Sequence, residues 1–290
     1  MYKKQSYTEA MAVLITKADG EREPFNPHKL EESLKRAGAP ADIAIQIKDG
    51  VSKELYSGMT TQELYSRAFA RLREARREVA ARYSLKRAVL EFGPSGFPFE
   101  EYLAQLFITE GYTAQTDQIV PGKCVEHEVD VVMHKGDTTT YVEAKFHNTA
   151  GFKSDLKVAL YVKARLDDID ARRAAVGTRG RMHGLLVTNT KFTSQAVQFA
   201  SCAGLELLGW ELPGDQTLHT RIEAAHLYPI TVLTTLNRRE KMALLEQKVV
   251  LCRELPKAEQ QLAKAGVSPH KAAQALEEVE ALCGTQKGLE

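Results

Sequence analysis

The stretch from Glu128 to Asn148 constrains the fold most, because apolar and polar residues alternate in it on both sides of a short turn at Lys135-Gly136-Asp137. Alternation with a period of two predicts strands, and two such runs around a glycine-containing turn predict a hairpin. Side chains two positions apart on a strand share a face, so Glu143 and Lys145 are expected to point the same way. A hairpin that closes at Gly136 also places Asp130 nearly opposite Glu143. The sequence therefore predicts two carboxylates and an ammonium group on one patch.

That patch is suited to a divalent cation. Two carboxylates that lie close together raise each other's pKa unless a cation balances their charge. A hard cation takes carboxylate and carbonyl oxygens, and Mg²⁺ also keeps several waters for chemistry. The alternative is a solvated edge hairpin with an ordinary pair between Glu143 and Lys145.

The spacing of these residues, with Glu143-Ala144-Lys145 thirteen positions after Asp130, resembles that of the PD-(D/E)xK nucleases. The chain from about Gly96 to Pro213, including KFHNTAGFKSDLKVALYVKAR and LLVTNTKFTSQAVQFASCAGLELLGW, is similar to the Mrr branch of restriction-endonuclease-like proteins. The motif lies on a predicted hairpin between two predicted helices, which is the context it requires. The resemblance implies an α/β core with a mixed sheet, DNA as the substrate, and Mg²⁺ held by Asp130, Glu143 and the main-chain carbonyl of Ala144. It assigns to Lys145 the orientation or deprotonation of the attacking water.

Two further positions belong to this predicted catalytic site. Mrr-type domains resemble this chain in having an acidic residue early in their first helix, which places Glu100 at the site and leaves Glu101 as the second choice. A carboxylate in a first helical turn is also favourable without any function. His147 lies two residues after Lys145, so it either contacts the scissile phosphate or is a structural histidine bonded to Asn148 or nearby backbone.

The N-terminal part of the chain predicts a small hairpin followed by helices. The run MAVLITKADGEREPF alternates and turns at Asp19-Gly20, a dipeptide that favours hairpins. Asn26-Pro27 then begins a helix, since proline is favoured at the first helical position. Further helices are predicted over residues 41–55, after Thr60 or Thr61 as the capping residue, and over residues 78–90.

This order of elements resembles the ATP cone, the nucleotide-sensing domain of ribonucleotide reductases and of their bacterial repressor. The matching pattern is I-x-K-x-D-G-x-x-x-x-F-N-x-x-K-L, which here runs from Ile15 to Leu30, although Ala18 stands where the family often has a basic residue. The resemblance implies that ATP or dATP binds at Ile15, Lys17, Glu23, Asn26, Lys29, Leu30, Thr61 and Lys86, with Arg87 as the alternative to Lys86. The chain has no GxxxxGK[ST] motif, so we expect ATP to be sensed and not hydrolysed. The simpler alternative is that Lys17 and Lys29 are ordinary surface lysines and Asn26 is only a helix cap.

The remaining segments complete a predicted three-part organisation. Residues 91–98, EFGPSGFP, are rich in Gly and Pro and predict a linker between an ATP-cone domain over 10–92 and a nuclease domain over 96–213. Residues 220–290 predict a helical region that binds a partner or dimerises. Between Arg172 and Arg181 a basic, Gly-containing segment predicts a loop that follows a phosphate backbone.

Composition limits the classes of protein that this chain can represent. Its net charge is +1, which gives no overall argument for nucleic acid. The sequence has no run of eighteen apolar residues, so we expect no membrane span. Its four cysteines are far apart and form no CxxC pair, which predicts free thiols in a reducing cytoplasm.

Taken together, these patterns predict an Mg²⁺-dependent DNA endonuclease, of the restriction or repair type, that is regulated by ATP or dATP. We expect a homo-oligomer, because nucleotide binding has to shift an equilibrium between conformations or assemblies. The alternative is a nucleotide-sensing DNA-binding protein with a vestigial nuclease site.

Overall fold

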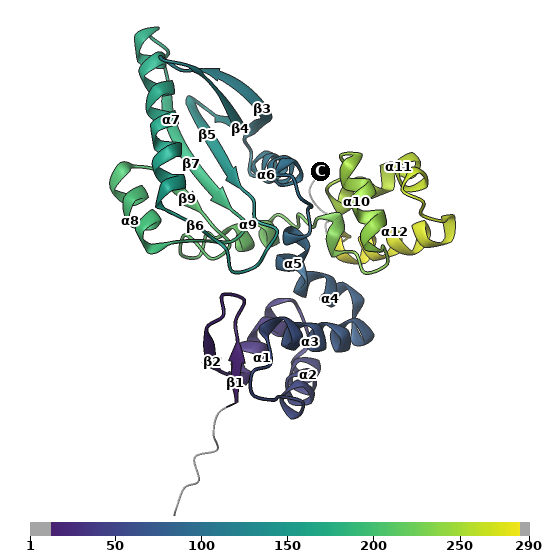
Figure 1. The fold of residues 1–290 in the computed structure, drawn as a ribbon. Coiled ribbons are helices and arrows are strands. Elements are labelled where there is room, and N and C mark those ends of the chain that lie inside the picture. The colour runs from purple at the N-terminus through teal and green to yellow at the C-terminus, as the bar shows by residue number, and fades with distance from the viewer. Residues whose placement is uncertain (1–12, 285–290) are drawn as a thin grey trace, which may run out of the picture. The chain divides into compact units, whose positions relative to one another are not determined.

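The computed structural model describes residues 13–284, and the chain divides into two units between Tyr83 and Ser84 (Figure 1). Residues 10–12 of the predicted N-terminal domain and residues 285–290 of the predicted C-terminal region lie outside the described part. Within residues 13–284, none of the helices combines the length and the apolar character needed to cross a membrane.

The first unit consists of a two-stranded hairpin and four helices, as the sequence predicts. Only the fourth helix differs, because it ends earlier than predicted. The strands pair antiparallel around Gly20, whose φ of +86° is readily adopted only by glycine. Leu30, Leu34, Ile47 and Leu72 are buried together in the core that the helices share. The elements are β1 (Leu14–Thr16), β2 (Arg22–Pro24), α1 (Pro27–Arg36), α2 (Ala41–Lys53), α3 (Thr61–Ala75) and α4 (Arg77–Tyr83).

Side chains fix the starts of two of these helices. The carboxamide oxygen of Asn26 accepts hydrogen bonds from the main-chain N–H groups of His28 at 2.9 Å and Lys29 at 3.3 Å. At α3 the capping residue is Thr60, which accepts a hydrogen bond from the N–H of Glu63 while its own N–H donates to the Glu63 carboxylate. A parallel bridge between Thr60 and β1 ties this second helix start to the hairpin.

The predicted helix over residues 78–90 is wrong as a single element. Helix α4 ends at Tyr83 and a separate helix, α5 (Leu85–Leu90), begins after Ser84. Helix α5 belongs to the second unit, where the carbonyl of Ala88 accepts a hydrogen bond of 2.8 Å from the hydroxyl of Thr231. No glycine or proline marks this break, so local sequence gave no signal for it.

The second unit is built on a five-stranded mixed sheet with the order β3-β4-β5-β7-β9, which confirms the predicted α/β class (Figure 1). Strands β3, β4 and β5 are antiparallel neighbours, whereas β7 runs parallel to β5 and β9 runs parallel to β7. A small parallel pair, β6 with β8, stands apart from the main sheet. The strands are β3 (Thr113–Pro121), β4 (Glu126–Lys135), β5 (Thr138–Lys145), β6 (Lys153–Ser154), β7 (Arg181–Thr188), β8 (Lys191–Phe192) and β9 (Glu206–Leu208).

Helices lie on both sides of this sheet (Figure 1). Helices α7 (Leu156–Ala175) and α8 (Ser194–Ala203) pack on one face, where Val162 and Leu166 join a buried cluster with Val132 of β4. A side chain at Gly184 of β7 would place its Cβ 2.2 Å from a methyl carbon of Leu166, so α7 approaches the sheet closely because that residue is glycine. On the other side, α6 (Phe97–Thr109) begins within the predicted linker and places Phe99 against Phe146, with ring centroids 5.7 Å apart.

The C-terminal part of this unit is helical, as the sequence predicts. Buried Glu278 accepts hydrogen bonds from the N–H groups of Thr234 at 2.6 Å and Thr235 at 2.9 Å. The hydroxyl of buried Tyr102 in α6 donates to the carbonyl of Leu227 at 2.6 Å and ties this region to the sheet domain. The elements are α9 (Leu218–Ala224), η1 (Ile230–Val232), α10 (Arg238–Glu246), η2 (Cys252–Lys257), α11 (Glu259–Lys264) and α12 (Pro269–Cys283).

Candidate active site

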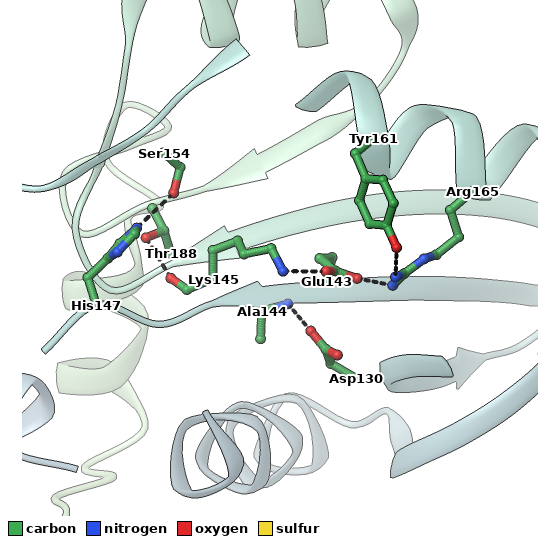
Figure 2. Close-up of polar contacts among 9 residues, drawn as sticks. All are labelled: Asp130, Glu143, Ala144, Lys145, His147, Ser154, Tyr161, Arg165 and Thr188. Atoms are coloured by element: carbon green, nitrogen blue, oxygen red, sulfur yellow. Dashed lines mark hydrogen bonds and ion pairs between the residues drawn. The ribbon is translucent and has the colours of Figure 1, made fainter. Parts of the chain in front are cut away.

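The register of β4 and β5 places the predicted acidic residues on adjacent strands. Paired residues run from Lys135↔Thr138 at the turn to Val131↔Val142, so the next position along β4, Asp130, lies across from Glu143. The Asp130 carboxylate accepts a hydrogen bond of 2.6 Å from the N–H of Ala144 (Figure 2). This is the arrangement that the spacing of the two acids predicts.

Glu143 and Lys145 share one face of β5. The Lys145 Nζ donates to the Glu143 Oε1 at 2.6 Å, and both side chains lie on the side of the strand that α7 covers (Figure 2). Glu143 is only 5% exposed, whereas Lys145 is 36% exposed and reaches towards solvent. The intervening Ala144 is buried, as the alternation predicts.

Helix α7 adds a charged partner that the sequence analysis did not identify. The Arg165 guanidinium donates to the second carboxylate oxygen of Glu143, and another of its nitrogens donates to the hydroxyl of Tyr161 at 2.8 Å (Figure 2). Lys145 and Arg165 therefore occupy the two oxygens of one buried carboxylate. Arg165 follows Glu143 by twenty-two positions on a different element, so only the packing of α7 on the sheet reveals the contact.

The carboxyl groups around this point disfavour one another's charge. Burial, and next the charge of Glu143, raise the pKa of Asp130 to about 6. Burial, followed by the charge of Asp130, raises the pKa of Glu100 to about 7. Glu101 faces other partners, since it accepts a hydrogen bond from Gln105 one helical turn later in α6. Of the two acidic residues at the start of α6, Glu100 is therefore the one whose pKa is raised by the charge of Asp130.

Asp117 of β3 is a further acidic residue beside this patch that sequence analysis missed. The register of β3 with β4 passes from Thr116↔Val131 to Gln118↔Val129, which puts Asp117 across from Asp130. Its φ of +54° is a left-handed conformation that is uncommon for residues other than glycine. The charge of Asp117 also contributes to the raised pKa of Glu100, after burial and Asp130.

The donor set fits a hard divalent cation. Asp130 and Glu100 are half-buried carboxylates whose pKa values are raised. They offer oxygen ligands, and a divalent cation would compensate their negative charge, which are the features that Mg²⁺ prefers. Among residues 13–284, no group of three or more His, Cys, Asp or Glu side chains is placed to hold a metal ion. Asp130 and Glu143 therefore need main-chain oxygen and water to complete a coordination sphere.

His147 is held by its neighbours in β6 and after β7. Its main-chain N–H donates to the Asn189 carboxamide at 2.8 Å, and its Nε2 lies 3.2 Å from the Ser154 hydroxyl. Phe152 stacks on its ring with centroids 5.4 Å apart. Burial, and then the charge of Lys145, lower the pKa of His147, which favours the neutral ring. The partner of the ring is the Ser154 hydroxyl, where the structural alternative expected Asn148 or nearby backbone.

In the first unit, two of the predicted nucleotide-binding residues, Lys17 and Lys29, pair with a third, Glu23. Lys17 Nζ lies 2.9 Å from one Glu23 oxygen, and Lys29 Nζ lies 3.9 Å from the other. Lys29 lies in the first turn of α1, where Asn26 already accepts hydrogen bonds from two N–H groups. Ile15 and Leu30 are buried, and Thr61 is the first residue of α3.

Lys86, the last predicted nucleotide-binding residue, lies in the second unit. It belongs to α5, and its Nζ is 3.4 Å from a Glu211 oxygen and 5.9 Å from the centre of the Trp210 ring. Burial lowers the pKa of Lys86, although the charge of Glu211 acts in the opposite direction. Its alternative, Arg87, pairs with Glu91 at 3.0 Å.

The predicted basic loop is shorter than expected and lies away from the carboxylates. Helix α7 continues through Ala175 and β7 begins at Arg181, so residues 176–180 form the loop. Arg181 pairs with Thr138 at the start of β5, whereas Lys145 lies at its end. Seven residues of strand separate the two positions, which corresponds to about 23 Å.

The fold and the site define a class: an α/β domain of the PD-(D/E)xK nuclease type that follows a hairpin-and-helix domain. Three family models match successive parts of the chain: the ATP cone domain over residues 13–89, the restriction endonuclease family Mrr over residues 94–211, and the AF1548-like C-terminal region over residues 228–283. The chain therefore belongs to the Mrr-type restriction endonuclease family and carries an ATP cone domain in front of the nuclease domain.

Individual relatives agree with that assignment. An uncharacterized protein of Archaeoglobus fulgidus is 33% identical over 183 residues, which cover 63% of this chain and the whole of the relative. A crystal structure titled as a protein of unknown function, AF1548, is 31% identical with a TM-score of 0.54, and it aligns over all of its own length and 66% of this chain.

Proposed function

We propose that this protein is a nucleotide-regulated, Mg²⁺-dependent DNA endonuclease that hydrolyses phosphodiester bonds in a restriction or repair process. The observation that carries the proposal is the position of Asp130, Glu143 and Lys145 on two neighbouring strands of an Mrr-type domain. Two acidic residues and a lysine in this order on a hairpin are the catalytic motif of the nuclease class that the fold defines.

Each residue has a distinct task in the proposed reaction. The carboxylates of Asp130 and Glu143 and the main-chain carbonyl of Ala144 would hold the cation, and Glu100 would contact it through water. A divalent cation bound there supplies a lower pKa for water and compensation for the charge of the transition state. Lys145, with its ammonium group at the solvent side of Glu143, orients the attacking water and neutralises negative charge that develops on the phosphate.

Regulation is proposed to come from the ATP cone. Lys29 lies in the first turn of α1 and Lys17 shares its partner Glu23, so both add positive charge to a helix start whose dipole favours an anion such as a triphosphate. One residue, Ser84, separates α4 of the first unit from α5 of the second. Because so short a connection limits independent motion, we expect ATP or dATP to change the rate of cleavage or the assembly of a homo-oligomer.

Cleavage of a supercoiled plasmid tests the proposal. The wild-type protein with Mg²⁺ should produce nicked and linear DNA, and EDTA should stop the reaction. Asp130→Ala and Lys145→Ala should each lower the rate by about 10²- to 10³-fold or more, while binding of labelled DNA without metal stays close to wild type. Lys163→Ala is the matched control, because that lysine pairs with Asp167 on the exposed side of α7 and makes no contact with the carboxylates.

Two results would contradict this assignment. Cleavage at the wild-type rate by either site variant would exclude these residues as the catalytic site. DNA binding without any cleavage by the wild type, across Mg²⁺ and Mn²⁺, would favour the alternative of a nucleotide-sensing DNA-binding protein with a vestigial site.

A further inference from the structure

Each carboxylate oxygen of Glu143 already has a positively charged partner in this structure. Lys145 occupies its Oε1 at 2.6 Å, and Arg165 occupies its Oε2. The carboxylate is 5% exposed, so water does not compete strongly with either partner. A cation that binds Glu143 therefore competes with these two groups for the charge of the carboxylate.

Of these two partners, Arg165 is the one better placed to release Glu143. It is held at a second point by Tyr161, whose hydroxyl accepts a 2.8 Å hydrogen bond and whose ring centroid lies 4.9 Å from the guanidinium carbon. Tyr161 is 58% exposed and precedes Arg165 by one helical turn, so this second contact lies at the solvent side of the site. Lys145, by contrast, is on the same strand as Glu143 and keeps its place in the motif.

The hydrogen-bonding capacity of Arg165 is also incompletely satisfied when it pairs with Glu143. Its Nε is buried and has no hydrogen-bond partner within residues 13–284. A buried donor without a partner has lost its hydrogen bonds to water without replacement, which is destabilising. This cost offsets part of the ion pair with Glu143 and lowers the free energy needed to release the guanidinium.

We propose that Arg165 is the counter-ion of the metal-free site: it gives up Glu143 when a divalent cation binds, stays attached to Tyr161, and then contacts the scissile phosphate. This inference rests on the proposed nuclease function and adds to it a residue and an order of events. Arginine is suited to both positions, because its planar donors match carboxylate and phosphate oxygens equally well. In the loaded site two positive side chains, Lys145 and Arg165, face the phosphate.

Cation binding without DNA gives a test that does not depend on activity. Titration of Mn²⁺, followed by calorimetry and by the paramagnetic resonance signal of the free ion, should show Arg165→Gln binding about five- to tenfold more tightly than wild type, because a competing ion pair is removed. Tyr161→Phe should change the Mn²⁺ affinity by less than about twofold, because the hydrogen bond between the guanidinium and the hydroxyl is present both before and after Glu143 is released. Lys163→Ala removes the same charge from the same helix and should bind Mn²⁺ like the wild type.

Single-turnover cleavage at saturating Mn²⁺ provides the second readout. Arg165→Gln should cleave about ten- to a hundredfold more slowly although its metal site is full, and Arg165→Lys should recover part of the rate. Thermal unfolding of each variant without metal identifies any general loss of structure. Tighter metal binding combined with slower cleavage is an outcome that a purely structural arginine does not produce.

Other outcomes overturn the inference. If Arg165→Gln binds Mn²⁺ more weakly than wild type or equally well, Arg165 serves to hold Glu143 in place and does not compete with the cation. If it binds more tightly but cleaves at the wild-type rate, its contact with the phosphate is excluded. If the wild type cleaves no DNA at all, the proposed function fails, whereas the Mn²⁺ titrations still decide whether Arg165 and a cation compete.

Discussion

In the first unit the lysines expected to bind a nucleotide face a carboxylate, whereas in the second unit Asp130, which is expected to bind a metal, accepts a main-chain hydrogen bond and lies close to the charge of Glu143. The hydrogen bond between Lys17 and Glu23 raises the pKa of the lysine and lowers that of the glutamate, so both stay charged at neutral pH. Around Asp130 the direction is reversed, since burial and the charge of Glu143 raise its pKa to about 6.

This difference indicates how each region is prepared for its ligand. The exposed pairs of the ATP cone are already balanced, so a triphosphate has to exchange one set of partners for another at little cost in stability. In the nuclease domain Glu143 has two positive partners, Lys145 and Arg165, but the raised pKa of Asp130 shows that its negative charge is not fully compensated. A trade-off between stability and function is therefore expected in the second unit and not in the first.

The largest effect that would sharpen this comparison between the two units is the loss of nucleotide binding when two lysines of the first unit are replaced. Isothermal titration of ATP and dATP into the full chain should show binding that Lys17→Ala with Lys29→Ala abolishes, because both sources of charge near the α1 N-terminus are gone. At a ligand concentration of a hundred times Kd, the wild type gains about 2.7 kcal/mol of stability by linkage, and the variant should gain none.

The control for that experiment is Lys35→Ala, which removes a lysine at the other end of α1 that pairs with Glu31. If the wild type shows no heat of binding at millimolar ATP or dATP, the cone is a structural relic and the regulatory half of the proposal fails. Ala18, where the family often has a basic residue, makes that comparison especially informative.

A smaller effect is expected in the second unit, where a substitution should raise the free energy of unfolding, whereas most substitutions lower it. Asp130→Asn should stabilise the protein at pH 8 by about 1 kcal/mol, a value reduced for the partial exposure of the carboxylate. The folded-state pKa of about 6 lies above the ordinary 3.8, so the folded protein binds more protons than the unfolded chain between these values. The gain should therefore be absent near pH 4, grow as the pH rises, and reach its full size above about pH 6.

Urea unfolding of wild type and Asp130→Asn at three pH values measures this gain, with Asp167→Asn on exposed α7 surface as the control. The asparagine oxygen can still accept the hydrogen bond from Ala144, so the comparison isolates the charge. A variant that is less stable than wild type at pH 8 would show that Asp130 is a stabilising ion and not an uncompensated one.

The smallest effect concerns the basic segment at the other end of β5. Arg172→Ala with Arg179→Ala should lower the slope of log affinity for DNA against log salt by about two, one phosphate contact for each arginine. Arg173 and Arg181 are left in place because they bond to Tyr141, Gly180 and Asp137 within the fold. Single-turnover cleavage at saturating DNA should not change, and an unchanged salt slope would mean that residues 172–181 are only a solvated turn and helix end.

The sequence predicted the hairpin and its acids because these depend on local order. Alternation set the faces of β4 and β5, Gly136 set the turn, and together they fixed Asp130 opposite Glu143. The cone hairpin followed from Asp19-Gly20 in the same way. In both cases the signal lies within about twenty residues of one continuous segment.

What the sequence did not predict depends on packing between distant segments. Arg165 reaches Glu143 because α7 crosses the sheet closely at Gly184, and no local pattern encodes that approach. The break between α4 and α5 is of the same kind, because α5, which carries Lys86, is bound within the second unit through Ala88 and Thr231. The left-handed conformation of Asp117 is another tertiary feature, since its sequence surroundings read as ordinary strand.

The account depends most on Asp130 and Glu143 being a cation site, and diffraction from crystals soaked in Mn²⁺ tests this most directly. Anomalous scattering should show one strong peak between the two carboxylates, within about 2.0–2.3 Å of an oxygen of each, with the Arg165 guanidinium moved off Glu143. The peak should be absent from Asp130→Asn crystals soaked in the same way. A wild-type protein that shows no peak at these carboxylates while Mn²⁺ binds elsewhere on the chain would contradict the assignment of the active site.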